Sequence, residues 1–258
     1  MYEAVMIAAT GLQNQQRRLD TIANNVANVN TVAFMNSRLD FKDALYTAGI
    51  VPGLPRTPEG NQQKGHGLMV AGVTRDFSGG NVQMTERQLD FALEGEGFFA
   101  LMGPDGETIY TRNGNFSLSV EIDGVYLVSS NGYYVLDADG ERIRIPEYTE
   151  SINVSEDGTI AFVIDEDETM GTSLGVYTFR NLTGLLSVGE SNYSESVASG
   201  ERMAAEGARV RQGALEGSNV SLADEMTRMI RTQRAFSLAS RALTTADEME
   251  GIANNMRR

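Results

Sequence analysis

The stretch TGLQNQQRRLDTIANNVANVNTVAF, residues 10–34, decides how this chain begins to fold. Within and just before it, apolar residues recur in alternating steps of three and four, with one polar step at Gln15. The stripe consists of Val5, Ala8, Leu12, Leu19, Ile22, Val26 and Val29. Such a narrow heptad stripe predicts a helix that packs along a partner helix.

Asparagines edge the end of this stripe, although asparagine is a poor helix former because its amide competes for backbone groups. A neutral amide that both donates and accepts can bond in a dry contact without bringing charge into it. We therefore expect Asn25 to fix the register of the helix and Asn28 to face a neighbouring copy. Asn30 is expected to end the helix ahead of Phe34, which would anchor the departing chain.

The other end of the chain predicts a second long helix. Ser221 and Asp224 resemble a capping box. Steps of three and four follow, and their mean, slightly under 3.5, favours a left-handed supercoil. This stripe consists of Leu222, Met226, Met229, Gln233, Phe236, Ala239, Leu243, Ala246, Met249, Ala253 and Met256. The two helices predict one antiparallel coiled coil, with the alternative that they only cap an ordinary domain.

Between the two helices the sequence is typical of β-structure. Turn dipeptides recur at Asp105-Gly106, Asp123-Gly124, Asn131-Gly132, Asp139-Gly140 and Asp157-Gly158. Short β-rich runs lie between them, at 125–130, 133–138, 142–147, 151–156 and 159–164. This pattern predicts an antiparallel sandwich or barrel. Leu89, Phe91 and Leu93 alternate, which predicts a strand with one buried face that ends at Gly95.

The predicted fold class is therefore α+β, with long N- and C-terminal helices pairing as a coiled coil around a central antiparallel β-rich domain. We expect five segments along the chain. They are a helix and turn at 1–45, a Gly/Pro-rich linker at 46–67, a β-rich outer domain at 68–186, an irregular connection at 187–212 and the second helix at 213–258.

The net charge of −14 is unevenly distributed. Residues 1–45 and residues 213–258 are each neutral, so the whole excess of acid lies in 46–212. An acidic middle repels phosphate backbones, which argues against a nucleic-acid partner. Neutral ends suit close packing of many copies, because like charges brought together would repel.

Several kinds of chemistry are excluded or disfavoured. The chain has no cysteine and one histidine, His66, which rules out disulfides, thiol catalysis and multi-histidine metal sites, and leaves no credible Ser–His–Asp triad. The carboxylates at 165–168 are expected to form a solvated loop. No apolar run reaches transmembrane length, and the start of the chain has no basic n-region, so we expect neither a transmembrane segment nor a cleaved signal. We expect no catalytic residue, cofactor or metal.

Four motifs, in order along the chain, resemble the bacterial flagellar basal-body rod and hook family. They are the opening stretch, LDFALEGEGFF (89–99), YTRNGNFSL (110–118) and GALEGSNVSLADEMTRMIRTQRAFSLASRAL (213–243). The length and the last motif are most similar to the rod members, the distal rod protein first and the proximal one next. Residues 68–79 also resemble hook proteins, which are usually longer. Ala33 and Met35 depart from the glycine and lysine common in the family around Phe34; Ala33 would be strained if that glycine needs a positive φ.

The resemblance implies a non-enzymatic structural subunit. In the family, the terminal helices form an inner coiled-coil layer and copies stack helically into a hollow axial tube that transmits rotation. It also implies export through the flagellar type III apparatus, a place in the basal body, and copies of itself and related rod and hook proteins as partners.

The residues expected to pack between subunits are Val5, Leu12, Leu19, Ile22, Asn25, Val26, Asn28, Val29, Phe34, Leu222, Met226, Met229, Gln233, Phe236, Leu243 and Met249. Two alternatives remain on the residues alone. One is an acidic module that binds calcium or sugar and oligomerises through its coiled coil, and the other is a hydrolase that uses two carboxylates.

Overall fold

The structure, a computed structural model, describes residues 2–44, 46–48, 63–65, 67–164, 167–205 and 207–256. His66, most of the expected linker, and Asp165 and Glu166 of the carboxylate run lie outside these ranges. The chain forms two compact units. The helical unit holds Met1–Ala27, Ser37–Arg75 and Ser221–Arg258, and the β unit holds Asn28–Asn36 and Asp76–Val220.

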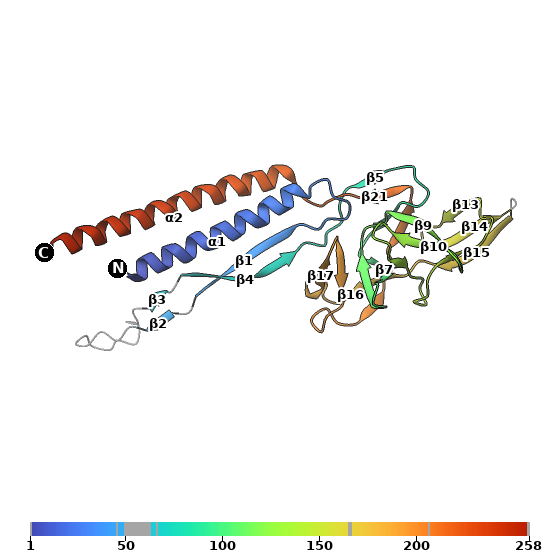
Figure 1. Cartoon of the computed structure of the whole chain (residues 1–258), viewed down its shortest axis with the longest axis horizontal. Helices are drawn as coiled ribbons and strands as arrows, with labels where there is room; N and C mark the ends of the chain where they lie inside the picture. Colours follow the sequence, from blue (N-terminus) through green and yellow to red (C-terminus); the bar gives the residue numbers. More distant parts are fainter. Residues whose placement is uncertain are drawn as a thin grey trace. The chain divides into compact units, whose positions relative to one another are not determined.

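In the helical unit, α1 (Tyr2–Ala27) and α2 (Leu222–Met256) lie side by side and run in opposite directions (Figure 1). A hairpin arm of β1 (Ser37–Asp43) and β4 (Leu68–Arg75) packs against α1. These strands pair antiparallel from Ser37 opposite Arg75 to Asp43 opposite Leu68, with a register shift between Asp40 and Phe41. β2 (Tyr46–Ala48) and β3 (Gln63–Gly65) form a further antiparallel pair.

The β unit is built on one large sheet in which β7 (Phe98–Met102) is central, pairing with β8, β11 and β16. The other strands of this sheet are β8 (Thr108–Thr111), β9 (Phe116–Glu121), β10 (Gly124–Ser129), β11 (Tyr134–Val135), β12 (Arg144–Ile145), β16 (Val176–Phe179), β17 (Leu186–Gly189), β18 (Asn192–Ser194) and β19 (Arg202–Ala204). A short 3-10 helix, η1, spans Leu182–Gly184.

Three smaller sheets complete the β unit. β13 (Ser151–Val154), β14 (Thr159–Ile164) and β15 (Asp167–Ser173) form an antiparallel sheet. Two pairs join strands far apart in sequence: β6 (Phe91–Glu94) with β20 (Arg209–Gln212), and β5 (Val82–Met84) with β21 (Ala214–Glu216). These pairs bring the end of the β unit back beside its beginning.

The turn chemistry predicted from the sequence is confirmed. All five glycines of the turn dipeptides have a positive φ, and each of the five β-rich runs contains a strand, β10 to β14. Glycine has no Cβ and enters the left-handed region without strain, which lets each strand reverse tightly.

Other details differ from the prediction. Phe91 and Leu93 are buried as expected, but Ala92 between them is buried too, so β6 is covered on both faces rather than one. Strands β17, β18, β19 and β20 run through the segment expected to be irregular. By its contacts β4 belongs with the helices, whereas the sequence suggested that the β-rich domain begins at residue 68.

Two apolar clusters form the core of the β unit. The larger includes Phe91, Phe99, Phe116, Ile143 and Phe162. The smaller surrounds Phe98, whose ring packs edge-on against Tyr193 and Phe179. Edge-to-face packing of this kind stabilises beyond simple burial.

Candidate assembly surfaces

The apolar stripe of α1 faces into the helical unit. Ile22 is buried, and the remaining stripe residues of the helix are half-buried: Val5, Ala8, Leu12, Leu19 and Val26. Residues of this spacing lie on one side of a helix, so the stripe is covered by α2 and the hairpin arm. Asn14, also buried, donates its side-chain N–H to the carbonyl oxygen of Leu68 at 2.6 Å and ties α1 to β4.

The inward face of α2 differs from the predicted stripe in its first turns. The covered positions include Glu225, Met229, Thr232, Phe236, Ala239, Leu243 and Ala246, again in steps of four and three, and Ala235 and Ser240 next to them are half-buried too. Leu222, Met226 and Gln233, which we expected on the packed face, are exposed, as is Met249. The pattern misled because two buried positions are polar: Glu225 binds neighbouring side chains, and Thr232 donates its hydroxyl to the Arg228 carbonyl oxygen at 2.8 Å.

Asn25 joins three elements of the helical unit. Its side-chain N–H group donates to the carbonyl oxygen of Ser37 at 2.8 Å, and its side-chain oxygen accepts from the Ser37 backbone N–H at 3.1 Å. It also donates to Glu225 Oε2 at 3.2 Å, and Arg228 donates to the other oxygen of Glu225 at 2.8 Å. Both Asn25 and Glu225 are only 1% exposed. The Asn25 amide thus forms the same pair of hydrogen bonds with Ser37 that a neighbouring strand would form. Together with the bond to Glu225, these hydrogen bonds hold β1 and α2 against α1.

An arginine-lined cavity of about 170 Å³ lies beside Ser37 and Glu225, the hydrogen-bond partners of Asn25. The arginine-lined cavity is bounded by Arg18, Thr21, Ile22, Ser37, Arg38, Leu39, Glu225 and Arg228. Arg38 pairs with Asp40 at 2.9 Å, and Arg228 pairs with Glu225. Arg18 lies 5.9 Å from the ring of Phe41, and no ion pair of Arg18 occurs among the described residues. Three guanidinium groups therefore line the cavity, whereas Glu225 supplies the one carboxylate among the lining residues that the structure describes.

Asp40 is held in its charged form by its neighbours on the hairpin arm. The hydroxyl of Thr74 donates to Asp40 Oδ2 at 2.6 Å. This hydrogen bond is the main cause that lowers the pKa of the Asp40 carboxyl, and the hydrogen bond from Arg38 lowers it further.

The segment that follows α1 is held within the β unit. Helix α1 ends at Ala27, earlier than the sequence suggested, so Asn28 and Val29 lie in the turn, where both are half-buried. Ala33 is fully buried with a φ of 54°, and its N–H donates to the carbonyl oxygen of Glu216 at 2.8 Å. Phe34 is half-buried, while Met35 is 1% exposed in the smaller core cluster. Met35 rather than Phe34 therefore takes the core position in this segment.

A buried ion pair between Arg112 and Glu216 connects β21 to the rest of the β unit. Arg112 Nε lies 2.8 Å from Glu216 Oε2, with both side chains almost fully buried. Arg112 also donates to the carbonyl oxygens of Gly95 and Gly97, and the backbone N–H of Gly80 donates to Glu216 Oε1 at 2.7 Å. Sequence reasoning did not find this pair, because a lone arginine and a lone glutamate 104 positions apart give no local signal. Every carboxylate oxygen has a donor, as a buried charge requires.

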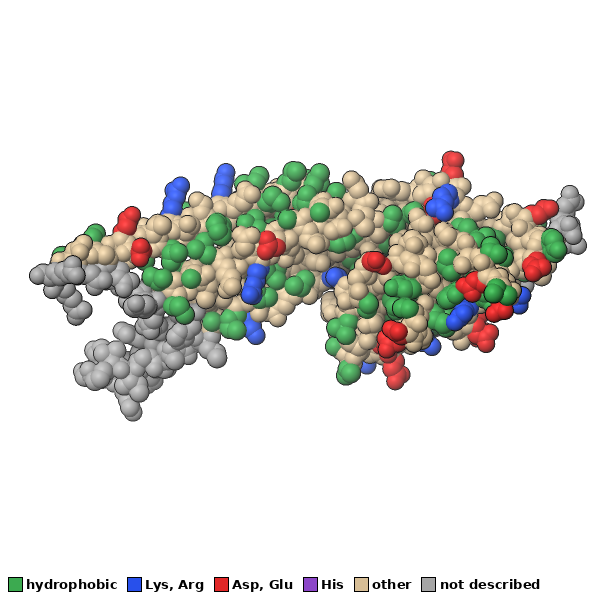
Figure 2. Space-filling view, in the orientation of Figure 1, with side chains coloured by type: hydrophobic (Ala, Val, Ile, Leu, Met, Phe, Trp, Pro, Cys, Tyr) green, Lys and Arg blue, Asp and Glu red, His purple; other side chains and the backbone are tan. Residues whose placement is uncertain are grey.

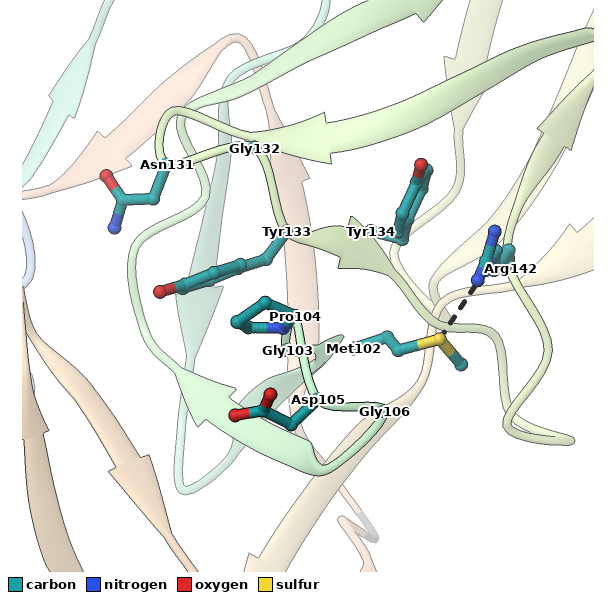
Figure 3. Close-up of a pocket in the computed structure, with 10 residues that line it drawn as sticks. All are labelled: Met102, Gly103, Pro104, Asp105, Gly106, Asn131, Gly132, Tyr133, Tyr134 and Arg142. Carbon is teal, nitrogen blue, oxygen red and sulfur yellow. Dashed lines mark hydrogen bonds between the residues drawn. The ribbon is translucent and has the colours of Figure 1, made fainter. Parts of the chain in front are cut away.

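A shallow hollow of about 480 Å³ lies between two turns of the β unit. Figure 3 shows Tyr133 near Pro104 and Asp105 of one turn and near Asn131 of the other. Arg142 donates to the sulfur of Met102 and lies 4.3 Å from the centre of the Tyr134 ring. The loop side chains at its rim are exposed, so we assign it no ligand.

Large apolar side chains are exposed along both helices. They are Met6, Ile7, Leu222, Met226, Ile230, Leu238, Met249, Ile252 and Met256. Figure 2 shows apolar side chains scattered over this part of the surface. Exposed apolar surface on this scale usually marks a contact with another protein.

Within the residues that the structure describes, no group of three histidine, cysteine, aspartate or glutamate side chains is placed to hold a metal ion. The described helices include none with the length and apolar character needed to span a membrane.

Three protein families match different parts of the chain. Residues 6–34 match "Flagella basal body rod protein", residues 92–162 match "Flagellar hook protein FlgE/F/G D1 domain", and residues 211–256 match "Flagellar basal body rod FlgEFG protein C-terminal". The first and last matches cover most of α1 and all of α2, and the middle match covers β7 to β13.

Full-length relatives agree with these matches. The chain is 41% identical over 273 aligned residues to the flagellar basal-body rod protein FlgG of Borreliella burgdorferi, and 38% identical over 269 residues to that of Bacillus subtilis. It is 28% identical to the flagellar hook-basal body complex protein FlhP of Bacillus subtilis. Each alignment covers all of both chains. The chain belongs to the flagellar basal-body rod protein family.

Proposed function

We propose that this protein is a structural subunit of the bacterial flagellar basal-body rod and acts through assembly rather than catalysis. The observation that carries this proposal is the full-length similarity to rod proteins named FlgG. The exposed apolar side chains on both helices support it, because they need a partner that the single chain does not supply.

In this proposal α1 and α2 pair as an antiparallel coiled coil, and copies polymerise helically through these helices into a hollow tube that transmits torque. Supporting this, the covered positions of α2 follow heptad spacing, and the covered stripe of α1 does so too. The two helices carry different outward faces, which suits heterologous contacts between copies, and such contacts extend into an open helical filament when the rotation does not close a ring.

The outward faces divide the predicted packing residues into two groups. Leu222, Met226 and Met249 are exposed in the single chain and are proposed to contact a neighbouring copy, together with Gln233. Ile22, Met229, Phe236 and Leu243 face the partner helix of the same chain and are proposed to support the shape of that surface.

We further propose that the protein works in the basal body beside related rod and hook proteins, and reaches it through the flagellar type III export apparatus. Among the rod members, the distal rod protein is favoured, because the FlgG proteins are more similar in sequence than the FlhP protein.

The proposal is tested by replacing the gene with one that encodes a tagged chain and isolating basal bodies. Antibody labelling should fall on the rod in electron micrographs, and deletion of the gene should leave cells without a completed rod and unable to swim. Labelling elsewhere in the cell, or normal swimming after deletion, would refute the proposal.

A further inference from the structure

We propose that the arginine-lined cavity of the helical unit binds the acidic end of α2 from a second copy of this chain. The inference rests on the proposed polymer and adds to it a specific contact, with Arg18 on one side and Asp247 and Glu248 on the other.

The arginine-lined cavity would receive the acidic residues, because its positive charges outnumber the carboxylates that pair with them. Arg38 and Arg228 already have carboxylate partners, whereas Arg18 has only the ring of Phe41 among the described residues. Asp20 stands two positions away on α1, where it accepts a hydrogen bond from Gln16 at 3.0 Å. A guanidinium group binds a carboxylate with two parallel hydrogen bonds, so the hollow is chemically suited to a carboxylate.

The donating side lies near the other end of the helix pair. Asp247 and Glu248 are exposed on the last turns of α2, beside the exposed Met249 and Ile252. Figure 2 shows acidic side chains toward the C-terminal end of α2 and basic ones further along it. Arg241 precedes this acidic pair by two turns, and Arg257 and Arg258 follow at the end of the chain.

The two sides cannot meet within one chain. Arg228 and Asp247 are separated by 19 positions of a continuous helix, which at 1.5 Å per residue is about 28 Å. A second copy that lies beside the first in the same orientation, shifted by about this distance along the helix axis, would place its Asp247 and Glu248 at the level of the first copy's cavity. The same shift repeats for the next copy, because the contact joins two different patches.

The apolar surroundings strengthen the contact. Ile22 and Leu39 line the cavity, and Met249 and Ile252 flank the acidic pair. Ile22 and Leu39 are already buried within their own chain, so the exposed Met249 and Ile252 of the second copy are the side chains that would exclude water around the charges. Charge pairs that lose water in this way are worth more than exposed surface pairs and are less screened by salt.

Cysteine cross-linking tests the contact directly, because the chain has no cysteine of its own. Cells would express Arg18→Cys and Glu248→Cys chains together, and the rods would be oxidised and run on a non-reducing gel. The proposal predicts a dimer band that needs both variants. The control pairs Arg17→Cys with Glu248→Cys, since Arg17 is exposed on the next position of α1 but does not line the cavity.

A charge swap measures the energy of the contact. Arg18→Glu and Glu248→Arg should each reduce the number of completed rods per cell about tenfold, the effect of losing one moderate charge pair, while the double variant recovers most of the loss. Arg17→Glu should have little effect. Circular dichroism of the purified variants checks that the helices still form.

The outcomes separate the inference from the proposed function. If the unmodified chain builds no rod, the proposed function fails. If it builds rods, but Arg18→Glu assembles as well as Arg17→Glu, or the cross-link forms equally from position 17, the inference is wrong and the rod assignment stands.

Discussion

Ala33 lies in the first segment of the β unit, after the end of α1, at a backbone angle that favours glycine. Its φ of 54° lies in the left-handed region, where a Cβ costs roughly 1–2 kcal/mol. The departure of Ala33 from the family's glycine thus coincides with a strained backbone. The strain is held in place by burial of Ala33 and Met35 and by the hydrogen bond to Glu216.

Replacing Ala33 with glycine should therefore stabilise the β unit. We expect Ala33→Gly to raise the free energy of unfolding by about 1 kcal/mol, because the relief of strain exceeds the extra chain entropy of glycine. Urea denaturation followed by tyrosine fluorescence measures this. A lower free energy of unfolding for Ala33→Gly would show that the angle carries no strain.

Asn25 was expected to fix the register of the first helix, and the structure gives it partners on β1 and α2 of its own chain. Asn25→Leu removes the three hydrogen bonds to Ser37 and Glu225 and leaves buried polar groups without those partners. We expect a loss of roughly 2–4 kcal/mol from the stability of the helical unit. Gln13→Leu, a similar amide-to-leucine change at an exposed position of α1, is the control and should be near neutral. Equal melting curves for the two variants would exclude the role given to Asn25.

Thr74 should control the titration of Asp40 on the hairpin arm. Its hydroxyl is the main cause that lowers the pKa of Asp40, so Thr74→Val should raise that pKa toward its ordinary value. Because the folded-state pKa is depressed, this carboxylate stabilises the arm above its unfolded pKa, and the contribution is lost as the pH falls through the folded value. Carbon NMR titration of the Asp40 carboxyl in both proteins measures the shift; an unchanged pKa would contradict the assignment.

At the scale of elements, local sequence patterns predicted the helices and the hairpin turns. They did not predict the packed face at the start of α2 or the pairing of distant strands. Heptad spacing predicted α1 and α2, and Asp-Gly and Asn-Gly dipeptides predicted the hairpin turns, since both signals act between near neighbours. The packed face of the first turns of α2 was predicted wrongly, because two of its buried residues, Glu225 and Thr232, are polar. Their hydrogen-bond partners explain the burial and are not evident from the sequence. The pairings of β5 with β21 and β6 with β20 join strands more than 100 residues apart, where a single sequence carries no pairing signal.

The two faces of α2 should respond differently to the same substitution. Leu243 is half-buried toward α1, so Leu243→Asp should cost the single chain roughly 2 kcal/mol of stability as well as its assembly. Leu238 is 65% exposed, so Leu238→Asp should leave the single chain unchanged and prevent rod formation. Thermal melts of purified protein and swimming assays of the matching strains separate the two effects. Normal swimming with Leu238→Asp would remove the outward face of α2 from the assembly.

At the scale of the whole molecule, charge is divided as an assembly of many copies requires. The helical ends are neutral, and the entire net charge of −14 lies in residues 46–212. Close packing of the helices then meets little repulsion, while acidic groups on the β unit disfavour non-specific association. This division was readable from the sequence, whereas the cavity beside Asn25 became visible only when three elements were brought together.

At the same scale, we propose that copies of this chain form a tube through their terminal helices. The most direct measurement is a helical reconstruction by electron cryomicroscopy of rods isolated from cells that express this chain. We expect α1 and α2 in an inner wall around an open channel, with the β unit outside and with Asp247 and Glu248 of one copy at the arginine-lined cavity of another. A rod in which the β units line the channel, or in which the helices of different copies do not touch, would contradict it.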